Sequence, residues 1–311
     1  MILVTGATNF VGRAVVRQLV NKRHEVRCLL QPSRRQQQLP TDITFSTVSA
    51  SVDDPLTLRV AMQDVTAVVH VMREGDPVQE GTLRKHVEGT VNLVAMAKEM
   101  GIQRFIYLSR LGAERASAYP LYRARGDAEA AVRESGLDYT IFQSTVIYGP
   151  EDAFTNVLVM LAKMSPFVLP IPNVSGSRFQ PLWAGDLATC IAAALDREDL
   201  VERTISIGGP EHFTLEQLVT QILESAGMRR RLMHVNMPFM RVATEFFEMV
   251  LLRNPTPLWW LDFVTVGSAT ELGAIPRHFG FEPRRFADRL RYLRTKQPWR
   301  RNFVRFILDY R

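Results

Sequence analysis

A glycine-rich turn stands near the start of the chain. Gly6 and Gly12 follow an apolar run, Ile2–Val4, and an amphipathic stretch, Arg13–Val20, comes after them. In a turn from strand to helix, the first glycine permits a tight bend and the last lets helix and strand pack closely. Backbone N–H groups and the helix N-terminus can then cradle a dinucleotide pyrophosphate. Asn9 stands where a middle glycine would be usual, and we expect the turn to survive because asparagine tolerates positive φ better than other residues with a side chain.

The first half of the chain alternates β-rich runs with helical patterns, which favours a parallel sheet built from strand–helix–strand units. We predict strands at residues 2–5, 25–30, 44–48, 67–71, 104–108, 139–143 and 203–207, and helices at residues 12–22, 55–62, 83–100, 123–135 and 214–226. Asp54 and Pro55 are typical of a helix start, with a capping side chain and a proline at the first helical position. The sequence therefore predicts an α/β fold with a doubly wound parallel sheet.

A proline-rich segment, residues 166–181, divides the chain. We predict that residues 1–165 form a dinucleotide-binding domain and that residues 182–209 return to it. Residues 166–181 and 210–311 are expected to form a smaller C-terminal lobe that shares the core, because no flexible linker separates the two parts.

Composition places the chain among ordinary globular proteins, with 46% hydrophobic and 23% charged residues. Cys28 and Cys190 lack the spacing of a metal or redox motif, which indicates a reducing compartment. No cluster of His, Cys, Asp and Glu has metal-ligand spacing, so we expect no metal. No secretion signal precedes the first strand and no apolar run is long enough to span a bilayer. We expect a cytoplasmic protein, with peripheral attachment to a membrane as a further option.

The net charge of +6 is concentrated at the C-terminus, where residues 288–311 contain eight Lys or Arg and two Asp. In this tail, apolar residues recur at helical spacing and arginines occupy mostly the other side; they are Trp299, Phe303, Phe306, Ile307 and Tyr310, and Arg300, Arg301 and Arg305. The pattern is typical of an amphipathic basic helix that binds an anionic lipid surface or an acidic protein partner. Packing on its own domain is the alternative. Nucleic acid is not expected, because the rest of the chain lacks basic patches.

Residues 229–261 are rich in Met, Phe and Trp. They form either the core of the C-terminal lobe, with the mouth of a substrate pocket, or a hydrophobic docking face. The sequence leaves both interpretations open.

Several segments together match one family. The turn at residues 5–12 (TGATNFVG) is joined by residues 87–93 (VEGTVNL), 104–109 (RFIYLS), 146–150 (VIYGP), 179–181 (FQP), 207–210 (IGGP), 279–283 (FGFEP) and 290–293 (LRYL). Over most of residues 1–293 the chain resembles the atypical short-chain dehydrogenase/reductase family, whose members have a Rossmann fold. Within that family it is most similar to the branch of the NAD(P)H-binding accessory subunit of respiratory complex I and NmrA-like proteins. Fold alone does not determine a reaction.

The resemblance implies a catalytic tyrosine that acts as acid and base, and a lysine four residues later that lowers the tyrosine pKa. Aligning the run at residues 125–129 (RGDAE) with the family pattern puts Arg125 at the lysine position and Leu121 at the tyrosine position. Tyr122 comes one residue late, which turns it about 100° around the helix. Tyr119 lies before a proline, in the preceding loop.

Two interpretations of this site compete. In one, Tyr122 or Tyr119 reaches the nicotinamide and Arg125 replaces lysine, although an arginine fork is not equivalent to a compact ammonium. Ser109, which stands at the family's catalytic serine position, then binds a substrate oxygen; otherwise it simply ends the fifth strand. In the other interpretation, the proton-transfer machinery has been lost and the fold binds a dinucleotide without turning it over. We favour the second, and Ser109, Tyr122 and Arg125 are the candidate catalytic residues if the first holds.

The residues after the second strand indicate which dinucleotide binds. An Asp or Glu there would hydrogen-bond the ribose 2′-hydroxyl of NAD, and a nearby arginine would accommodate the 2′-phosphate of NADP. Gln31 ends the strand without an acid, and Arg34 and Arg35 follow, so we expect NADP(H) in preference to NAD(H). The alternative is that the two arginines form a solvated basic loop. Ser51 and Val52 stand where relatives place an acid and an apolar residue against adenine.

The residues expected at the cofactor come from the glycine turn, the arginine-bearing helix and the segments at the ends of strands. They are Gly6, Thr8, Asn9, Phe10, Val11, Gly12, Gln31, Arg34, Arg35, Ser51, Val52, Val71, Met72, Arg73, Arg125, Gln143, Ser144, Thr145 and Val146. The leading hypothesis is a NAD(P)(H)-binding protein with a degenerate Tyr/Lys site that serves as a structural or assembly subunit or as a redox sensor. The alternative is an active NAD(P)H-dependent oxidoreductase or epimerase acting on a small substrate.

Overall fold

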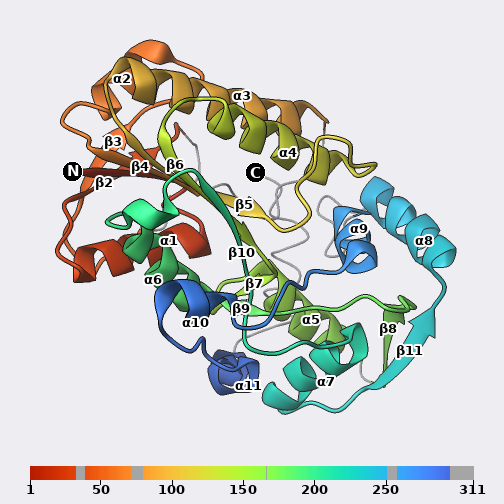
Figure 1. The fold of residues 1–311 in the computed structure, drawn as a ribbon. Helices are drawn as coiled ribbons and strands as arrows, with labels where there is room; N and C mark the ends of the chain where they lie inside the picture. The colour runs from red at the N-terminus through yellow and green to blue at the C-terminus, as the bar shows by residue number, and fades with distance from the viewer. Residues whose placement is uncertain (33–38, 72–79, 166, 251–257, 295–311) are drawn as a thin grey trace. The chain divides into compact units, whose positions relative to one another are not determined.

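Two compact units make up the structure (Figure 1). The computed structural model describes residues 1–32, 39–71, 80–165, 167–250 and 258–294. Unit 1 comprises Met1–Ser144, Ala184–Ile207 and Gly273–Glu282, and unit 2 comprises Thr145–Trp183, Gly208–Leu272 and Pro283–Arg311. The predicted division differs from these bounds: residues 145–165, 182–183 and 208–209 belong to unit 2, and residues 273–282 belong to unit 1.

Unit 1 is built on a seven-stranded sheet in which every strand runs parallel to its neighbours. The order across the sheet is β10-β6-β5-β4-β1-β2-β3, with β1 at Ile2–Thr5, β2 at Val26–Leu30, β3 at Ser46–Ser49, β4 at Ala67–Val71, β5 at Arg104–Arg110, β6 at Asp138–Ser144 and β10 at Arg203–Ile207. The chain winds one way from β1 to β3 and the other way from β4 to β6. The topological switch point, where doubly wound sheets bind ligands, therefore lies between β1 and β4.

Helices cover both faces of this sheet, as Figure 1 shows. The helices of unit 1 are α1 (Phe10–Asn21), α2 (Pro55–Ala61), α3 (Glu80–Glu99), α4 (Pro120–Arg133), α6 (Ala184–Ala194) and α10 (Ala274–Phe279), with a 3-10 turn, η1, at Glu198–Leu200. α3 packs beside α4, and α1 packs beside α6. Every residue of β1 and β4 is buried, as expected of a parallel sheet between two helical layers. The predicted α/β class and its double winding are confirmed.

Local sequence explains where the helices begin. Asp54 caps α2 by accepting a hydrogen bond from the Leu56 N–H, and Pro55 takes the first helical position, as predicted. α4 begins at Pro120, three residues before the predicted start. Proline has the fixed φ of a first helical turn, so Pro120 starts the helix and Tyr119 takes the capping position without a side-chain hydrogen bond.

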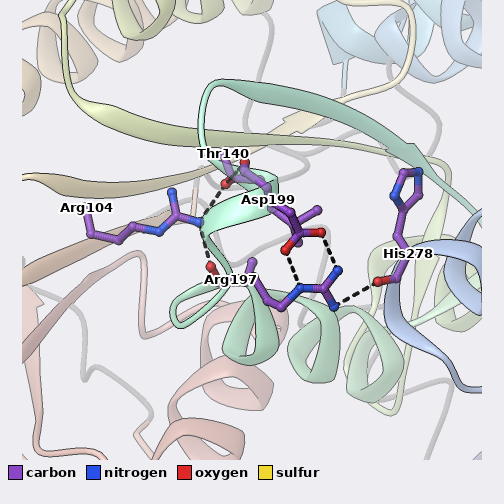
Figure 2. A network of polar contacts seen from close by, with 7 residues as sticks. Arg104, Thr140, Arg197, Asp199 and His278 are labelled. Atoms are coloured by element: carbon purple, nitrogen blue, oxygen red, sulfur yellow. Dashed lines mark hydrogen bonds and ion pairs between the residues drawn. The ribbon is translucent and has the colours of Figure 1, made fainter.

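One arginine ties the amino-terminal edge of the sheet to the end of α6 (Figure 2). Arg104, at the start of β5, donates to the Asp138 carbonyl oxygen at 2.6 Å, the Thr140 hydroxyl at 2.7 Å and the Ala194 carbonyl oxygen at 2.5 Å. Three acceptors from two elements thus share one guanidinium, whose fork of donors holds them in a fixed geometry.

A second arginine nearby lies at the surface. Arg197 pairs with both carboxylate oxygens of Asp199 and donates to the His278 carbonyl oxygen at 3.1 Å, as Figure 2 shows. Both charged side chains of this pair are exposed, so the pair contributes little to stability.

Unit 2 contains two small parallel sheets and several helices. β7 (Ile147–Tyr148) pairs with β9 (Leu182–Trp183), and β8 (Val168–Pro172) pairs with β11 (Arg231–Val235). Its helices are α5 (Ala153–Met164), α7 (Leu215–Ser225), α8 (Met237–Val250), α9 (Leu258–Val266) and α11 (Phe286–Arg289), followed by a 3-10 turn, η2, at Leu290–Arg294. Buried aromatic rings meet edge to face in its core, with Tyr148 against Phe286 and Phe179 against Phe263.

A buried carboxylate joins two ends of unit 2. Asp152 caps α5 and accepts hydrogen bonds from the Gly149 N–H, the Thr155 hydroxyl and the Tyr292 hydroxyl. Burial raises the pKa of Asp152 to about 6, against the lowering effect of these donors. The network attaches η2 to the start of α5.

The Met-, Phe- and Trp-rich stretch, residues 229–261, divides between interior and surface. Trp260 and Leu261 of α9 are buried in the core of unit 2, whereas Phe239 and Phe246 of α8 are exposed. The core interpretation therefore holds for α9 and not for the outer face of α8.

The basic helix predicted within residues 299–310 lies outside the described residues. Within the described part of the chain, no helix combines the length and the apolar composition needed to cross a bilayer.

We expect Arg104→Met to lower the free energy of unfolding by about 2–3 kcal/mol, because it leaves acceptors of β6 and α6 without their donor. Arg197→Met, which removes a surface ion pair, should change the unfolding free energy little. Urea titration followed by circular dichroism measures both variants. Equal losses in the two would contradict the role assigned to Arg104.

Candidate functional site

The glycine turn between β1 and α1 brings two backbones into close contact. Gly6 has a positive φ of 68°, and a Cβ there would collide with the Val71 carbonyl oxygen at the end of β4. A Cβ at Gly12 would collide with the Gly6 carbonyl oxygen. Both positions therefore require glycine, as the sequence predicts, and Val71 is placed at the turn.

Asn9 completes the turn in a different way from the prediction. Its backbone is extended, with φ −82° and ψ 164°, so no tolerance of positive φ is needed and that reasoning was wrong. Instead Asn9 is the N-cap of α1, and its Oδ1 accepts a hydrogen bond from the Gly12 N–H at 2.6 Å. Asparagine is favoured there because its short side chain satisfies a helix donor that has no backbone partner.

Several donors remain at this helix terminus. The Asn9 Nδ2 atom is buried and has no hydrogen-bond partner among the described residues. The N–H groups of Phe10 and Val11, in the first helical turn, have no acceptor within the helix. Arg13 donates to the Thr8 carbonyl oxygen and so braces the turn. A buried amide donor without a partner, beside free N–H groups at the helix N-terminus, fits a pyrophosphate, which would accept these hydrogen bonds.

The segment after β3 meets α3 closely. Val52 lies so near Gly89 that a Cβ at position 89 would come within 2.8 Å of its Cγ2, and the Asn92 side chain donates to the Val52 carbonyl oxygen at 3.0 Å. The Ser51 hydroxyl accepts from the Asp53 N–H at 3.2 Å, so it serves the local turn. This explains why the Val-Glu-Gly-Thr run carries a glycine.

Five further residues were predicted to contact the cofactor. Gln31 is exposed just beyond the end of β2. Four others lie outside the described residues: Arg34, Arg35, Met72 and Arg73.

A buried histidine, which the sequence analysis did not single out, links β1, β4 and α3. His70 Nδ1 lies 2.6 Å from the Thr5 hydroxyl, and its Nε2 lies 3.1 Å from the Thr90 hydroxyl. Because Thr90 donates its proton to the His86 carbonyl oxygen, it accepts from Nε2, and Nδ1 accepts from Thr5. The signal in the sequence was one histidine within an otherwise apolar strand.

Burial keeps this histidine neutral. It lowers the pKa of His70 to about 3, and the nearby Arg125 and His86 side chains add to the effect. The ring stacks on Tyr107, with centroids 5.4 Å apart. A neutral, fully hydrogen-bonded imidazole is thus part of the interior below the switch point.

The arginine at the family's lysine position is buried with a tyrosine from another element. Arg125 of α4 is only 4% exposed, and its guanidinium hydrogen-bonds the hydroxyl of Tyr107 on β5. Burial nevertheless raises the pKa of Tyr107 to about 12, because desolvation outweighs the nearby positive charge. Tyr107 therefore stays protonated at neutral pH.

The candidate tyrosine of α4 packs into the loop that precedes the helix. Tyr122 is 2% exposed, its ring contacts Tyr119 edge-on with centroids 6.1 Å apart, and a Cβ at Gly112 would lie 3.2 Å from its Cε1. Tyr122 and Arg125 are three positions apart and both buried, so they share the inner side of α4. Ser109 is also buried, next to the end of β5.

Gln143, predicted beside the nicotinamide, belongs to a buried polar chain. Its Nε2 donates to both carboxylate oxygens of Glu129, at 3.1 and 3.0 Å, and its Oε1 accepts from the Ser206 hydroxyl at 3.2 Å. Arg133 forms an ion pair with the same carboxylate. Glu129 is fully buried, and this chain connects α4 with β6 and β10.

Three further predicted residues have internal partners. The Ser144 hydroxyl donates to the Ser109 carbonyl oxygen at 3.2 Å within unit 1. In unit 2, the Thr145 hydroxyl donates to the Gln180 carbonyl oxygen at 2.5 Å, and the Val146 carbonyl oxygen accepts from the Leu182 N–H at 2.8 Å.

Among the residues that the structure describes, no group of three or more His, Cys, Asp or Glu side chains is placed to hold a metal ion.

Known proteins match this turn and sheet. A model of the NAD(P)H-binding family matches residues 6–163, just over half of the chain. The chain belongs to this family. It therefore contains a NAD(P)H-binding domain, and a nicotinamide dinucleotide is the ligand that the turn between β1 and α1 fits.

Two curated relatives are parts or assembly factors of larger complexes. The mitochondrial NADH dehydrogenase [ubiquinone] 1 alpha subcomplex subunit 9 of Arabidopsis thaliana is 27% identical over 266 residues, which cover 82% of this chain and 65% of the relative. The chain thus spans slightly less than two thirds of that protein. Photosystem II assembly factor Ycf39 of Guillardia theta is 25% identical over 302 residues, covering 91% of this chain and 89% of the relative.

Solved structures share the fold. An NADPH-dependent quinone oxidoreductase from Escherichia coli, solved with NADPH, superposes with a TM-score of 0.74 at 18% identity, covering 95% of this chain and all of that chain. This likeness confirms the fold class predicted from the sequence.

We expect Asn9→Asp to weaken NADPH binding by at least about tenfold, because a carboxylate replaces a donor amide beside the pyrophosphate. The unfolding free energy should be unchanged, since aspartate caps helices as well as asparagine does. Titration of NADPH fluorescence measures the affinity. Asn9→Ser is the control, because serine keeps the cap without the charge and should weaken binding less than aspartate does. Equal affinities in the wild-type protein and Asn9→Asp would contradict a pyrophosphate at this turn.

We expect the protein to lose stability as pH falls from about 6.5 to about 3, because the unfolded chain takes up a proton on His70 that the folded protein excludes. In this window the unfolding free energy of the wild-type protein should depend on pH more steeply than that of His70→Gln, by up to about 1.4 kcal/mol per pH unit. Urea titrations at several pH values measure the slopes. Equal slopes would show that His70 is accessible to protons in the folded state.

Proposed function

We propose that this protein binds NADP(H) in unit 1 without turning it over. The bound nucleotide then supports a structural or assembly role in a larger protein complex, or serves as the signal of a redox sensor. The proposal rests on the dinucleotide-binding turn together with the loss of a proton-transferring tyrosine at its usual position.

One observation carries this proposal: the cation at the lysine position is hydrogen-bonded to a strand tyrosine. Arg125 contacts Tyr107, whose hydroxyl stays protonated because burial raises its pKa to about 12. In the family pattern, a lysine instead lowers the pKa of a helix tyrosine so that the phenolate is accessible. Leu121 occupies that tyrosine position here. The polar groups of α4 thus support the interior instead of moving a proton.

The residues of the turn are sufficient to hold the dinucleotide. The N–H groups of Phe10 and Val11 and the Asn9 amide would donate to the pyrophosphate, and the glycines at positions 6 and 12 allow β1, α1 and β4 to meet closely enough to place these donors together. A bound nicotinamide would supply a hydride donor or acceptor. Binding without turnover needs only the turn, whereas hydride transfer to a substrate also needs a group that moves a proton.

The preference for NADP(H) rests on charge. No carboxylate follows β2, where Gln31 is exposed, so nothing there repels a 2′-phosphate. Arg34 and Arg35, which come next in the sequence, offer guanidinium groups that suit phosphate.

The names of the relatives support the assembly role. One is a subunit of NADH dehydrogenase and the other is a photosystem II assembly factor. We propose that this chain, like these two relatives, has a protein complex as its partner.

One observation favours a second candidate, an oxidoreductase or epimerase. Tyr107 hydrogen-bonds Arg125, and the buried Ser109 stands two residues further along β5 on the same side of the strand, so a serine, a tyrosine and a cation lie together. An oxidoreductase or epimerase of this kind requires Tyr107 or Tyr122 to donate a proton to the substrate.

We expect the purified protein to bind NADPH more tightly than NADH and to oxidise neither above the blank rate with quinones, aldehydes or nucleotide sugars. Tyr107→Phe and Tyr122→Phe should match the wild-type protein in both respects, because neither hydroxyl moves a proton. Fluorescence titration measures binding, and the loss of NADPH absorbance measures turnover. Turnover that falls about a hundredfold or more in either variant would establish the oxidoreductase instead.

The assembly role has its own readout in the cell of origin. Native electrophoresis of the tagged protein should show a large complex that persists with Tyr122→Phe and is lost with Asn9→Asp. If the complex also persists with Asn9→Asp, then binding of the partner does not depend on the nucleotide.

A further inference from the structure

The small sheet of unit 2 that joins β8 and β11 has an open edge. β11 pairs with β8 on one side, in parallel register (Figure 1). Among the elements that the structure describes, only β8 packs along the length of β11. Arg231, Met233 and His234 of β11 are exposed. The other side of β11 is therefore the edge of the sheet, where a strand presents backbone groups that have no strand beside them.

The hydrogen bonds to β8 show which residues of β11 face this edge. The Arg231 N–H donates to the Phe167 carbonyl oxygen at 3.1 Å, so the backbone groups of Arg231 point toward β8. In a strand the N–H and C=O groups of one residue point to the same side, and successive residues alternate. Leu232 and His234 therefore direct their N–H and C=O groups away from β8, toward the open edge.

The free edge of β8 is protected by prolines, whereas that of β11 is not. In the same ladder the backbone groups of Leu169 and Ile171 meet β11, so Pro170 and Pro172 stand at the positions that face away from it. Proline has no N–H to offer a further strand, and proteins use it to block sheet edges. The sequence of β11, RLMHV, contains neither proline nor lysine. The sheet is thus open to a further strand on the β11 side.

We propose that β11 is the contact between two copies of this chain, which pair edge to edge in antiparallel orientation around a two-fold axis at Met233. In this register Leu232 of one copy lies opposite His234 of the other, and the reverse. Both are hydrogen-bonded pairs, so every backbone group that these residues direct to the edge gains a partner. The two small sheets become one sheet of four strands, and a sheet of that size is more stable than a two-stranded one.

The side chains in this register suit a second copy of the chain. Met233, which is 49% exposed, lies opposite itself in a non-hydrogen-bonded pair, where side chains approach closely. Arg231 lies opposite Val235, so no like charges meet directly across the contact. A parallel arrangement in register would instead place Arg231 opposite Arg231. The antiparallel register is self-complementary, as an interface with two-fold symmetry must be.

Disulfide formation at the proposed axis tests both the occupant and the register. Residues in a non-hydrogen-bonded antiparallel pair have Cα atoms about 4.5 Å apart, which a disulfide can span. The native Cys28 and Cys190 are buried. Met233→Cys should therefore form a covalent dimer on oxidation, seen on a non-reducing gel. Met164→Cys is the control, because Met164 is 44% exposed and lies outside β11, and this variant should not cross-link.

Two variants at one position test the backbone hydrogen bonds. Light scattering over a dilution series should show that the wild-type protein dimerises. His234→Pro should raise the dimer dissociation constant at least about tenfold, because proline removes an N–H that faces the other copy. His234→Ala keeps that N–H and should dimerise as the wild-type protein does. Both variants lose the same exposed contact with Glu216, so that contact does not affect the comparison.

Three results would overturn the inference. They are a wild-type protein that stays monomeric, a Met233→Cys variant that cross-links no more than Met164→Cys, and a dimer that His234→Ala weakens as much as His234→Pro does. If the near-UV circular dichroism of His234→Pro differs from that of the wild-type protein, the cross-linking result decides. Every variant should keep the wild-type affinity for NADPH, which separates this test from that of the proposed function.

Discussion

The close approach of two backbones at the first turn is the constraint on which the nucleotide site depends. A side chain at Gly6 would collide with the carbonyl oxygen of Val71, and one at Gly12 with the carbonyl oxygen of Gly6. Only with both glycines can α1 begin directly after β1, with its N-terminus beside the end of β4. Asn9 then caps the helix and leaves an amide donor at the place where a pyrophosphate binds.

Helix α4 contributes buried charged groups to the interior of unit 1. Arg125 and Glu129 are one turn apart, and both are buried on its inner side. Arg125 contacts Tyr107 and lies near the neutral His70, whereas Glu129 accepts from Gln143. Each buried charge thus has a partner, which offsets the cost of removing it from water.

The two units differ in composition as well as in fold. Unit 1 has no net charge and holds the dinucleotide turn, whereas unit 2 has the whole net charge and most of the exposed hydrophobic side chains among the described residues. In α8, Arg241 pairs with Asp262 of α9, whereas Glu245 and Glu248 are exposed on the same helix as Phe239 and Phe246.

Local pattern by itself determined the strands and four helices of unit 1, the double winding of the sheet and the glycines of the turn, because burial and backbone geometry act on residues adjacent in the chain. It did not predict α6 and α10 of the same unit. The resemblance to the reductase family placed Arg125 at the lysine position. The tertiary structure decided the partners. Asn9 caps a helix instead of adopting positive φ, and Arg125 contacts a tyrosine of β5 instead of a neighbour on α4. These outcomes depend on contacts between segments far apart in the sequence, which no periodicity or motif records.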